Sequence, residues 1–261
     1  MRKPMSNAPA PQHPTTPTTD PANTAWHENA ARVHAHQCSP TPGPLDNLNH
    51  THNKSCKKAN INIATLNING FRSGGNNLEK WSMVNQTLNK HKIAILALQE
   101  MHLDQEHVDK LSRSFGKKMD IRFSADSDAP CATAEVAFII NKSLITPQKI
   151  TTHEIIVGKA LNIKVEWLDN ETSSFMNIYA PNARAAHENF WQVVDKSRRD
   201  LHVPIPNFLL GDFNVTEDPI DQLPTRLDDP NTIEALRNTR LVWGINDAWR
   251  MTYPENKEFT Y

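Results

Sequence analysis

Apolar residues follow two different spacings along the chain from about residue 59 onward. The segment INIATLN (61–67) has the pattern of a strand, and IAILALQ (93–99) is a continuous apolar run of the kind found in strands buried on both faces. Between them, apolar residues recur at helical spacing over 77–90. The pattern therefore predicts a strand, a helix and a second strand in succession.

The same alternation continues beyond residue 100, with more strands than helices. Further strands are predicted at 120–125, 135–141, 161–168, 173–180 and 207–211. Further helices are predicted at 106–116, 187–200 and 231–241. Because several strands follow one another directly, the pattern favours two packed sheets with helices outside them over a doubly wound parallel sheet. We therefore expect an α/β domain over 59–261.

The first 58 residues have a different composition. They hold half of the 18 prolines and almost no periodic apolar residues, so they cannot bury enough surface to offset the entropy of ordering. This predicts a disordered tail over 1–58. The tail contains HAHQC and HTHNKSC, whose imidazole and thiol groups are zinc ligands in other proteins. Their spacing matches no known zinc motif, so we expect a polar tail without a metal.

Charge and cysteine content narrow the function classes. A net charge of −1 argues against a protein held on nucleic acid by bulk positive charge, and the basic run at Lys196, Arg198 and Arg199 is typical of a solvated helix face. Three unevenly spaced cysteines favour a reducing compartment. No apolar run reaches the ~18 residues of a membrane span, and the N-terminus lacks the apolar region of a secretory signal. Nuclear or cytoplasmic localisation is expected.

Polar residues gather where four predicted strands end. Each residue has an ordinary interpretation, since asparagine forms turns, aspartate caps them, glutamate faces solvent and a tyrosine hydroxyl reaches the rim of a core. Together they match what hydrolysis of a phosphodiester requires, which is a carboxylate for a hard cation, an acid for water and donors for phosphate oxygens. The residues are Asn67 with Asn69, Gln99 with Glu100, Tyr179 with Asn182, and Asp212 with Asn214.

The chemistry assigns a role to several of these side chains. Glu100 suits a Mg²⁺ ligand, because Mg²⁺ commonly uses only one or two carboxylates and keeps several waters. Asp212 is placed to orient or deprotonate the attacking water. Asn214, Asn182 and Tyr179 then donate hydrogen bonds to nonbridging phosphate oxygens.

The motifs ATLNINGFR, LALQEMHL, NIYAPN and LLGDFNV occur in that order over residues 61–215, and 228–261 continues the similarity. They resemble the endonuclease/exonuclease/phosphatase superfamily, specifically the apurinic-like endonuclease domain of non-LTR (LINE-type) retrotransposons. The resemblance implies a four-layer α/β sandwich of two packed mixed sheets flanked by helices, a monomer, and DNA nicking that depends on Mg²⁺ (or Mn²⁺). It makes Glu100 the metal-binding glutamate and Asn67 the asparagine beside that metal. Asp212 and Asn214 become the pair that orients water and stabilises the transition state, and Tyr179 and Asn182 become phosphate-site residues.

Three features depart from that family. Asn69 stands where repair-type relatives often have aspartate, and Glu135 stands where a glycine is expected. The chain also stops at Tyr261, before the family's Ser-Arg-Ile-Asp-like motif and terminal Asp-His pair. We therefore expect a C-terminally truncated domain that lacks its last strands and has weak or no activity. No histidine in the domain is expected to replace the missing one, because surface placement is expected for His91, His102, His107, His153, His187 and His202.

Two other functions remain open at this point. The chain could be a catalytically dead DNA-binding or inert remnant, or a phosphatase of the same superfamily acting on inositol phosphates or a lipid headgroup. The nucleic-acid branch is favoured by NIYAPN and by DAWRMTYP, residues 247–254.

Overall fold

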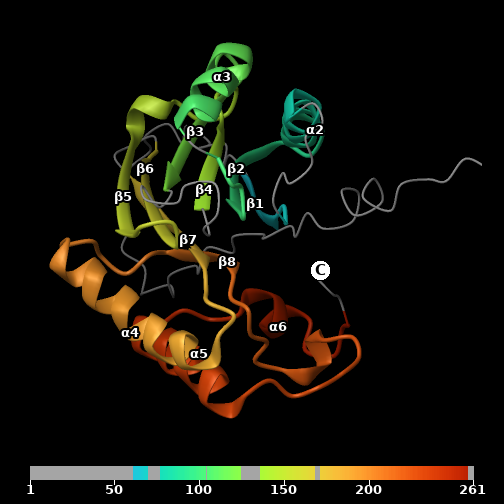
Figure 1. Cartoon of the computed structure of the whole chain (residues 1–261), viewed down its shortest axis with the longest axis vertical. Coiled ribbons are helices and arrows are strands. Elements are labelled where there is room, and N and C mark those ends of the chain that lie inside the picture. The colour runs from blue at the N-terminus through green and yellow to red at the C-terminus, as the bar shows by residue number, and fades with distance from the viewer. Residues whose placement is uncertain (1–60, 70–76, 104, 125–135, 168–170, 258–261) are drawn as a thin grey trace, which may run out of the picture.

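The computed structural model describes residues 61–69, 77–103, 105–124, 136–167 and 171–257. These residues form two sheets with helices on both outer sides (Figure 1). The predicted tail over 1–58, with its histidines and cysteines, lies outside the described residues, as does Glu135.

The first sheet has the strand order β1-β2-β4-β3. It comprises β1 (Asn62–Asn67), β2 (Ile93–Gln99), β3 (Met119–Ser124) and β4 (Val136–Asn141). β1 and β2 are parallel, whereas β4 runs antiparallel to both β2 and β3. Every residue of β2 and β4 is buried, which explains their continuous apolar sequences.

The second sheet has the order β5-β6-β7-β8. It comprises β5 (Ile150–Ile156), β6 (Ala160–Glu166), β7 (Thr172–Tyr179) and β8 (Phe208–Asp212). β5, β6 and β7 are antiparallel neighbours, and β7 and β8 are parallel. Sequence patterning did not predict β5, because this edge strand exposes Thr151, Thr152 and Glu154 and therefore lacks an apolar run.

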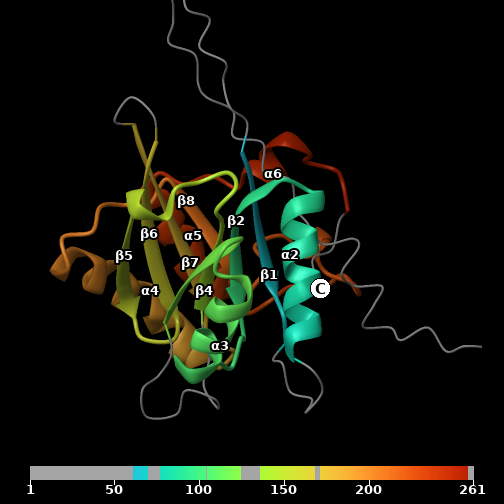
Figure 2. The same cartoon turned by 90° about the horizontal axis from the view of Figure 1, so that it is seen from above.

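The described residues form three apolar cores, which lie between the layers. One lies between the sheets, another under α2 (Asn77–Lys90) and α3 (Gln105–Phe115), and the third under α4 (Arg184–Asp200) and α5 (Pro230–Trp243). Figure 1 shows the resulting order of helices, sheet, sheet and helices, and Figure 2 views the molecule from the side of α2 and α3. The predicted fold class, two mixed sheets with flanking helices, is confirmed.

Shorter elements complete the described part of the chain. They are two 3-10 helices, Pro147–Lys149 and Pro219–Asp221, and the short helix α6 (Ala248–Thr252). The Arg250 guanidinium on α6 donates to the Asp221 carboxylate, which joins α6 to the loop that follows β8. Within the described ranges, no helix combines the length and the apolar character that crossing a bilayer requires.

The predicted basic face of α4 is smaller than its sequence suggested. Lys196 and Arg199 are exposed and form ion pairs with Asp200 and Asp195 of the same helix. Arg198 is buried instead, with its guanidinium 5.2 Å from the Trp243 ring centroid, because it packs between α4 and α5. It is therefore a structural residue and not part of a solvated strip.

Candidate active site

The ends of four strands meet at one edge of the sandwich. Parallel pairing places Asn67 opposite Gln99 in the first sheet and Tyr179 opposite Asp212 in the second. Because parallel strands end on the same side of a sheet, each sheet presents two polar strand ends together. β1 and β2 also contact β8, so these ends come together across the two sheets.

Hydrogen bonds join four of the predicted residues, which we call the strand-end cluster: Asn67, Glu100, Tyr179 and Asp212. The Asn67 Nδ2 donates to Glu100 Oε1 at 3.0 Å and to Asp212 Oδ2 at 2.7 Å. The Tyr179 hydroxyl donates to the same Glu100 Oε1 at 2.8 Å. All four residues are half-buried, so they are held in place and still reach solvent.

The cluster brings two carboxylates close to one phenol. Burial raises the pKa of Tyr179, and so do its hydrogen bond to Glu100 and the negative charges of Glu100 and Asp212. The phenol therefore stays protonated near neutral pH and acts as a donor. A cation placed beside the two acids would reduce their mutual repulsion.

Unusual backbone conformations occur in the strand-end cluster and in the residues beside it. Glu100 has φ 56° and Asn214 has φ 50°. Asparagine tolerates this left-handed region, but glutamate rarely adopts it, at a cost of about 1–2 kcal/mol. Gly211 has φ 132°, and a Cβ there would lie 2.0 Å from the Ile178 carbonyl oxygen. Strain of this kind is concentrated at functional sites in proteins.

The other two predicted site residues lie next to the cluster or apart from it. The Asn214 backbone N–H donates to Asp212 Oδ1 at 3.0 Å, and its side-chain Nδ2 donates to the Ala180 carbonyl at 2.6 Å. Asn182 is exposed just before α4, and within the described residues its side chain makes no hydrogen bond to the cluster. The fold thus unites four of the six predicted residues, with Asn214 on the adjoining turn.

A buried amide bridge beneath the cluster was not predicted from the sequence. The Gln99 Nε2 donates to Asn177 Oδ1 at 2.6 Å, and the Asn177 Nδ2 donates to the carbonyls of Leu98 at 2.9 Å and Ala137 at 2.8 Å. This bridge joins β7 to β2 and β4. Gln99 directly precedes Glu100, and Asn177 lies two residues before Tyr179. The available signal was a single amide within each of the apolar runs ILALQ and FMNIY.

His187 contradicts the prediction that it lies on the surface. Its side chain is 2 % exposed, and its Nε2 bonds to the carbonyl oxygen of Phe213 at 2.8 Å. The reason is helical spacing, because His187 lies three and four residues before Phe190 and Trp191, which face the sheet. His187 therefore supports the turn between Asp212 and Asn214 and is not a surface group.

Comparison with solved structures identifies the fold. An AP endonuclease from Leishmania major is 15% identical with a TM-score of 0.58, and the match covers 91% of this chain and 82% of that one. An AP endonuclease from Archaeoglobus fulgidus is 18% identical with a TM-score of 0.54 and 75% of each chain covered. The Xenopus laevis APE2 catalytic domain is 18% identical with a TM-score of 0.50, covering 75% of this chain and 73% of that one. No protein-family model and no curated protein matches the chain.

The chain has the fold of the AP endonucleases. The identities are low, so this likeness establishes the architecture and leaves the chemistry to the side chains at the site.

The donor atoms of the strand-end cluster suit a hard divalent cation. Glu100 and Asp212 supply carboxylate oxygens, and no sulfur or imidazole belongs to the cluster. Asn67 turns its amide nitrogen toward both carboxylates, and its amide oxygen accepts from the Asn69 N–H at 2.8 Å. Mg²⁺ and Mn²⁺ take such ligands and fill the remaining positions with water. The described residues contain no group of three or more His, Cys, Asp or Glu side chains that could hold a metal, so water and substrate would have to supply most of the ligands.

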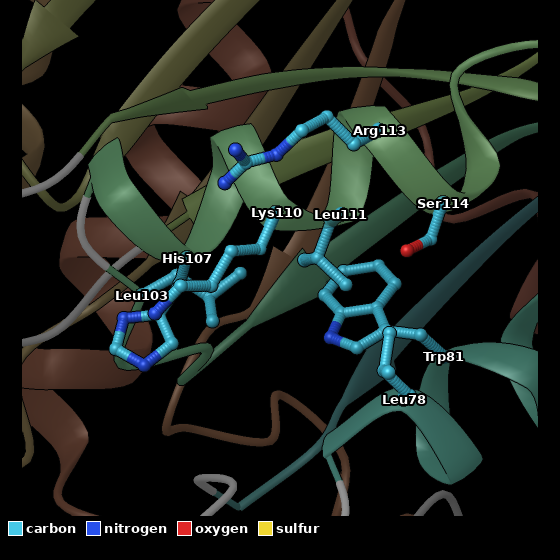
Figure 3. Close-up of a pocket in the computed structure, with 8 residues that line it drawn as sticks. All are labelled: Leu78, Trp81, Leu103, His107, Lys110, Leu111, Arg113 and Ser114. Atoms are coloured by element: carbon cyan, nitrogen blue, oxygen red, sulfur yellow. The ribbon is translucent and has the colours of Figure 1, made fainter.

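A separate cavity of about 450 Å³ lies between α2 and α3 (Figure 3). Apolar side chains form much of its wall, among them Trp81 and Leu111, and Lys110 and Arg113 also line it. None of the strand-end cluster residues lines this cavity, so it is not part of the candidate active site.

Proposed function

We propose that this chain is a divalent-metal-dependent phosphodiesterase that nicks DNA. The observation that carries the proposal is the strand-end cluster, in which one amide bridges two carboxylates at 3.0 and 2.7 Å and a phenol donates to one of them. The AP endonuclease fold supports the same reaction class, because the relatives with that fold are named as endonucleases.

In this proposal Glu100 holds the metal, Mg²⁺ or Mn²⁺, with Asn67 beside it. When bound, the cation would supply Lewis-acid polarisation of a phosphoryl oxygen and neutralisation of charge on the leaving oxygen. Asp212 orients or deprotonates the attacking water. Its Oδ2 accepts from Asn67 and its Oδ1 from the Asn214 N–H, which fixes the carboxylate and leaves a further lone pair on each oxygen for water.

The remaining residues are assigned to the phosphate. Tyr179 has a single hydroxyl proton, which it donates to Glu100, so it holds that ligand in place until a nonbridging phosphate oxygen competes for the proton. Asn214 uses one amide hydrogen on the Ala180 carbonyl and keeps a second for phosphate. Asn182 is exposed at the start of α4, where it is free to donate to the same group.

We further propose that the chain derives from a non-LTR retrotransposon and turns over slowly. The four ordered motifs over 61–215 support that origin. Among the described residues, no histidine is hydrogen-bonded to a cluster carboxylate, and the absence of one positioned acid, base or electrostatic group typically costs ~10² to 10⁴ in rate. A protein that binds DNA without cutting it is the second candidate, favoured by the same observation.

Nicking of supercoiled plasmid separates the two candidates. The wild-type chain is compared with Glu100→Gln and with Glu234→Gln, the same change at an exposed residue of α5, each with Mg²⁺ and with EDTA. The proposed enzyme nicks with Mg²⁺, and nicking is abolished by EDTA and by Glu100→Gln but is kept by Glu234→Gln. Equal Mg²⁺-dependent nicking by all three proteins would refute the assignment of Glu100.

A further inference from the structure

Lys159 lies at the edge of the strand-end cluster, in the turn between β5 and β6. Its Nζ is 5.4 Å from the centroid of the Tyr179 ring. The Tyr179 backbone N–H donates to the Lys159 carbonyl at 2.8 Å, so the turn is attached to the last residue of β7. The ammonium is thus placed on the face of the phenol whose hydroxyl contacts Glu100.

The turn that carries Lys159 is fixed from both sheets. The Gly158 N–H donates to Ser124 Oγ at 2.8 Å, and Ser124 is the last residue of β3 in the first sheet. Gly158 is buried and has φ 65°, a conformation that favours glycine. The lysine is therefore held near the cluster before any substrate binds.

Lys159 has no anionic partner in the described part of the chain. By contrast, Lys110 and Lys196 are paired with carboxylates, and Lys164 is exposed to water. Lys159 is half-buried without an ion pair, and burial lowers its pKa. Removing an ammonium from water is unfavourable unless an anion or an aromatic face replaces the lost hydration, and the Tyr179 ring replaces only part of it.

We propose that Lys159 binds a DNA phosphate at the candidate active site, contacting a nonbridging oxygen of a phosphate that lies against Tyr179. This inference rests on the proposed function, since it assumes that the cluster receives a DNA strand. Lys159 contributes a point positive charge beside two carboxylates that would otherwise repel the backbone. It thereby offsets part of that repulsion on the side where Tyr179 stands.

DNA binding as a function of salt tests this assignment without depending on turnover. Affinity for a short duplex is measured with Mg²⁺ over a series of KCl concentrations, using Glu100→Gln as the parent so that the duplex stays uncut. Loss of one phosphate contact lowers the slope of log Kd against log[KCl] by about 0.9 and weakens binding about eightfold at 0.1 M salt. We expect this result for Lys159→Met and recovery of the parent slope for Lys159→Arg.

The matched control is Lys164→Met, which removes an exposed lysine five residues further along the same hairpin, about 17 Å away at about 3.4 Å per residue. It should bind as the parent does. If the parent binds DNA and Lys159→Met keeps the parent slope while remaining folded by circular dichroism, the assignment of Lys159 is overturned and the proposed function stands. If the parent binds no DNA at any salt concentration, both are overturned.

Discussion

Replacing Asn177 with leucine should destabilise the domain strongly, because the buried amide bridge would lose its centre. The Asn177 side chain is fully buried and bonds to the Leu98 and Ala137 carbonyls and to the Gln99 amide. Each partner left buried and unsatisfied costs about 1–3 kcal/mol. The Gln99 amide keeps Thr65 as a partner, so the combined penalty is roughly 3–6 kcal/mol. Burying a leucine side chain returns about 2 kcal/mol.

The net expected loss for Asn177→Leu is roughly 1–4 kcal/mol in the free energy of unfolding, which is a substantial share of the ~5–15 kcal/mol that stabilises a typical domain. Urea unfolding followed by circular dichroism measures it. The control is Asn162→Leu in the same sheet, because Asn162 is 1% exposed and its Oδ1 has no hydrogen-bond partner. That change should be neutral or stabilising. A loss below about 1 kcal/mol for Asn177→Leu, or equal losses for both variants, would refute the proposed energetic role of the bridge.

Two further predictions concern the backbone and pH. Gly211→Ala should lower the free energy of unfolding, measured in urea, by roughly 3 kcal/mol or more, because the new methyl would meet the Ile178 carbonyl. Gly244→Ala, whose Cβ would have nothing within 4 Å, should lower it by only about 1–2 kcal/mol. Equal losses for the two variants would contradict this prediction. Burial alone would raise the pKa of Asp228, but hydrogen bonds from Thr216 and Gln222 outweigh it and lower that pKa. Because the Asp228 pKa is lower in the folded state, the ionised carboxylate stabilises the fold above about pH 4, and this stabilisation is lost as the pH falls through the folded-state pKa. The difference in unfolding free energy between wild type and Asp228→Asn should therefore be constant near neutral pH and shrink below about pH 4. A gap that widens on acidification would contradict the sign.

Much of the fold followed from local sequence pattern. The run IAILALQ is apolar throughout because β2 is buried on both faces, so its boundaries matched the strand residue for residue. β5 was missed because an edge strand need not bury alternate residues, and ITTHEII therefore resembles a loop. An apolar sequence pattern reveals buried strands, and it does not reveal a strand whose residues are largely exposed.

The polar strand ends of the candidate site were predictable from the sequence, but their assembly was not. A polar residue after an apolar run marks a strand end, which is how Glu100 and Asp212 were found. Their meeting requires a contact between Asn67 and Asp212, 145 residues apart, and no local pattern encodes such a distance. Lys159 and His187 were missed for a related reason, since each acts through a neighbour supplied by another element.

Binding of a divalent ion tests the central claim, that strand ends from two sheets form a metal site around Glu100. Mn²⁺ is titrated into the wild-type chain, Glu100→Gln and Glu234→Gln, and free Mn²⁺ is measured by electron paramagnetic resonance. We predict that wild type and Glu234→Gln bind an ion that Mg²⁺ displaces, and that Glu100→Gln binds it at least about tenfold more weakly. Equal Mn²⁺ affinity in Glu100→Gln and wild type would contradict the account.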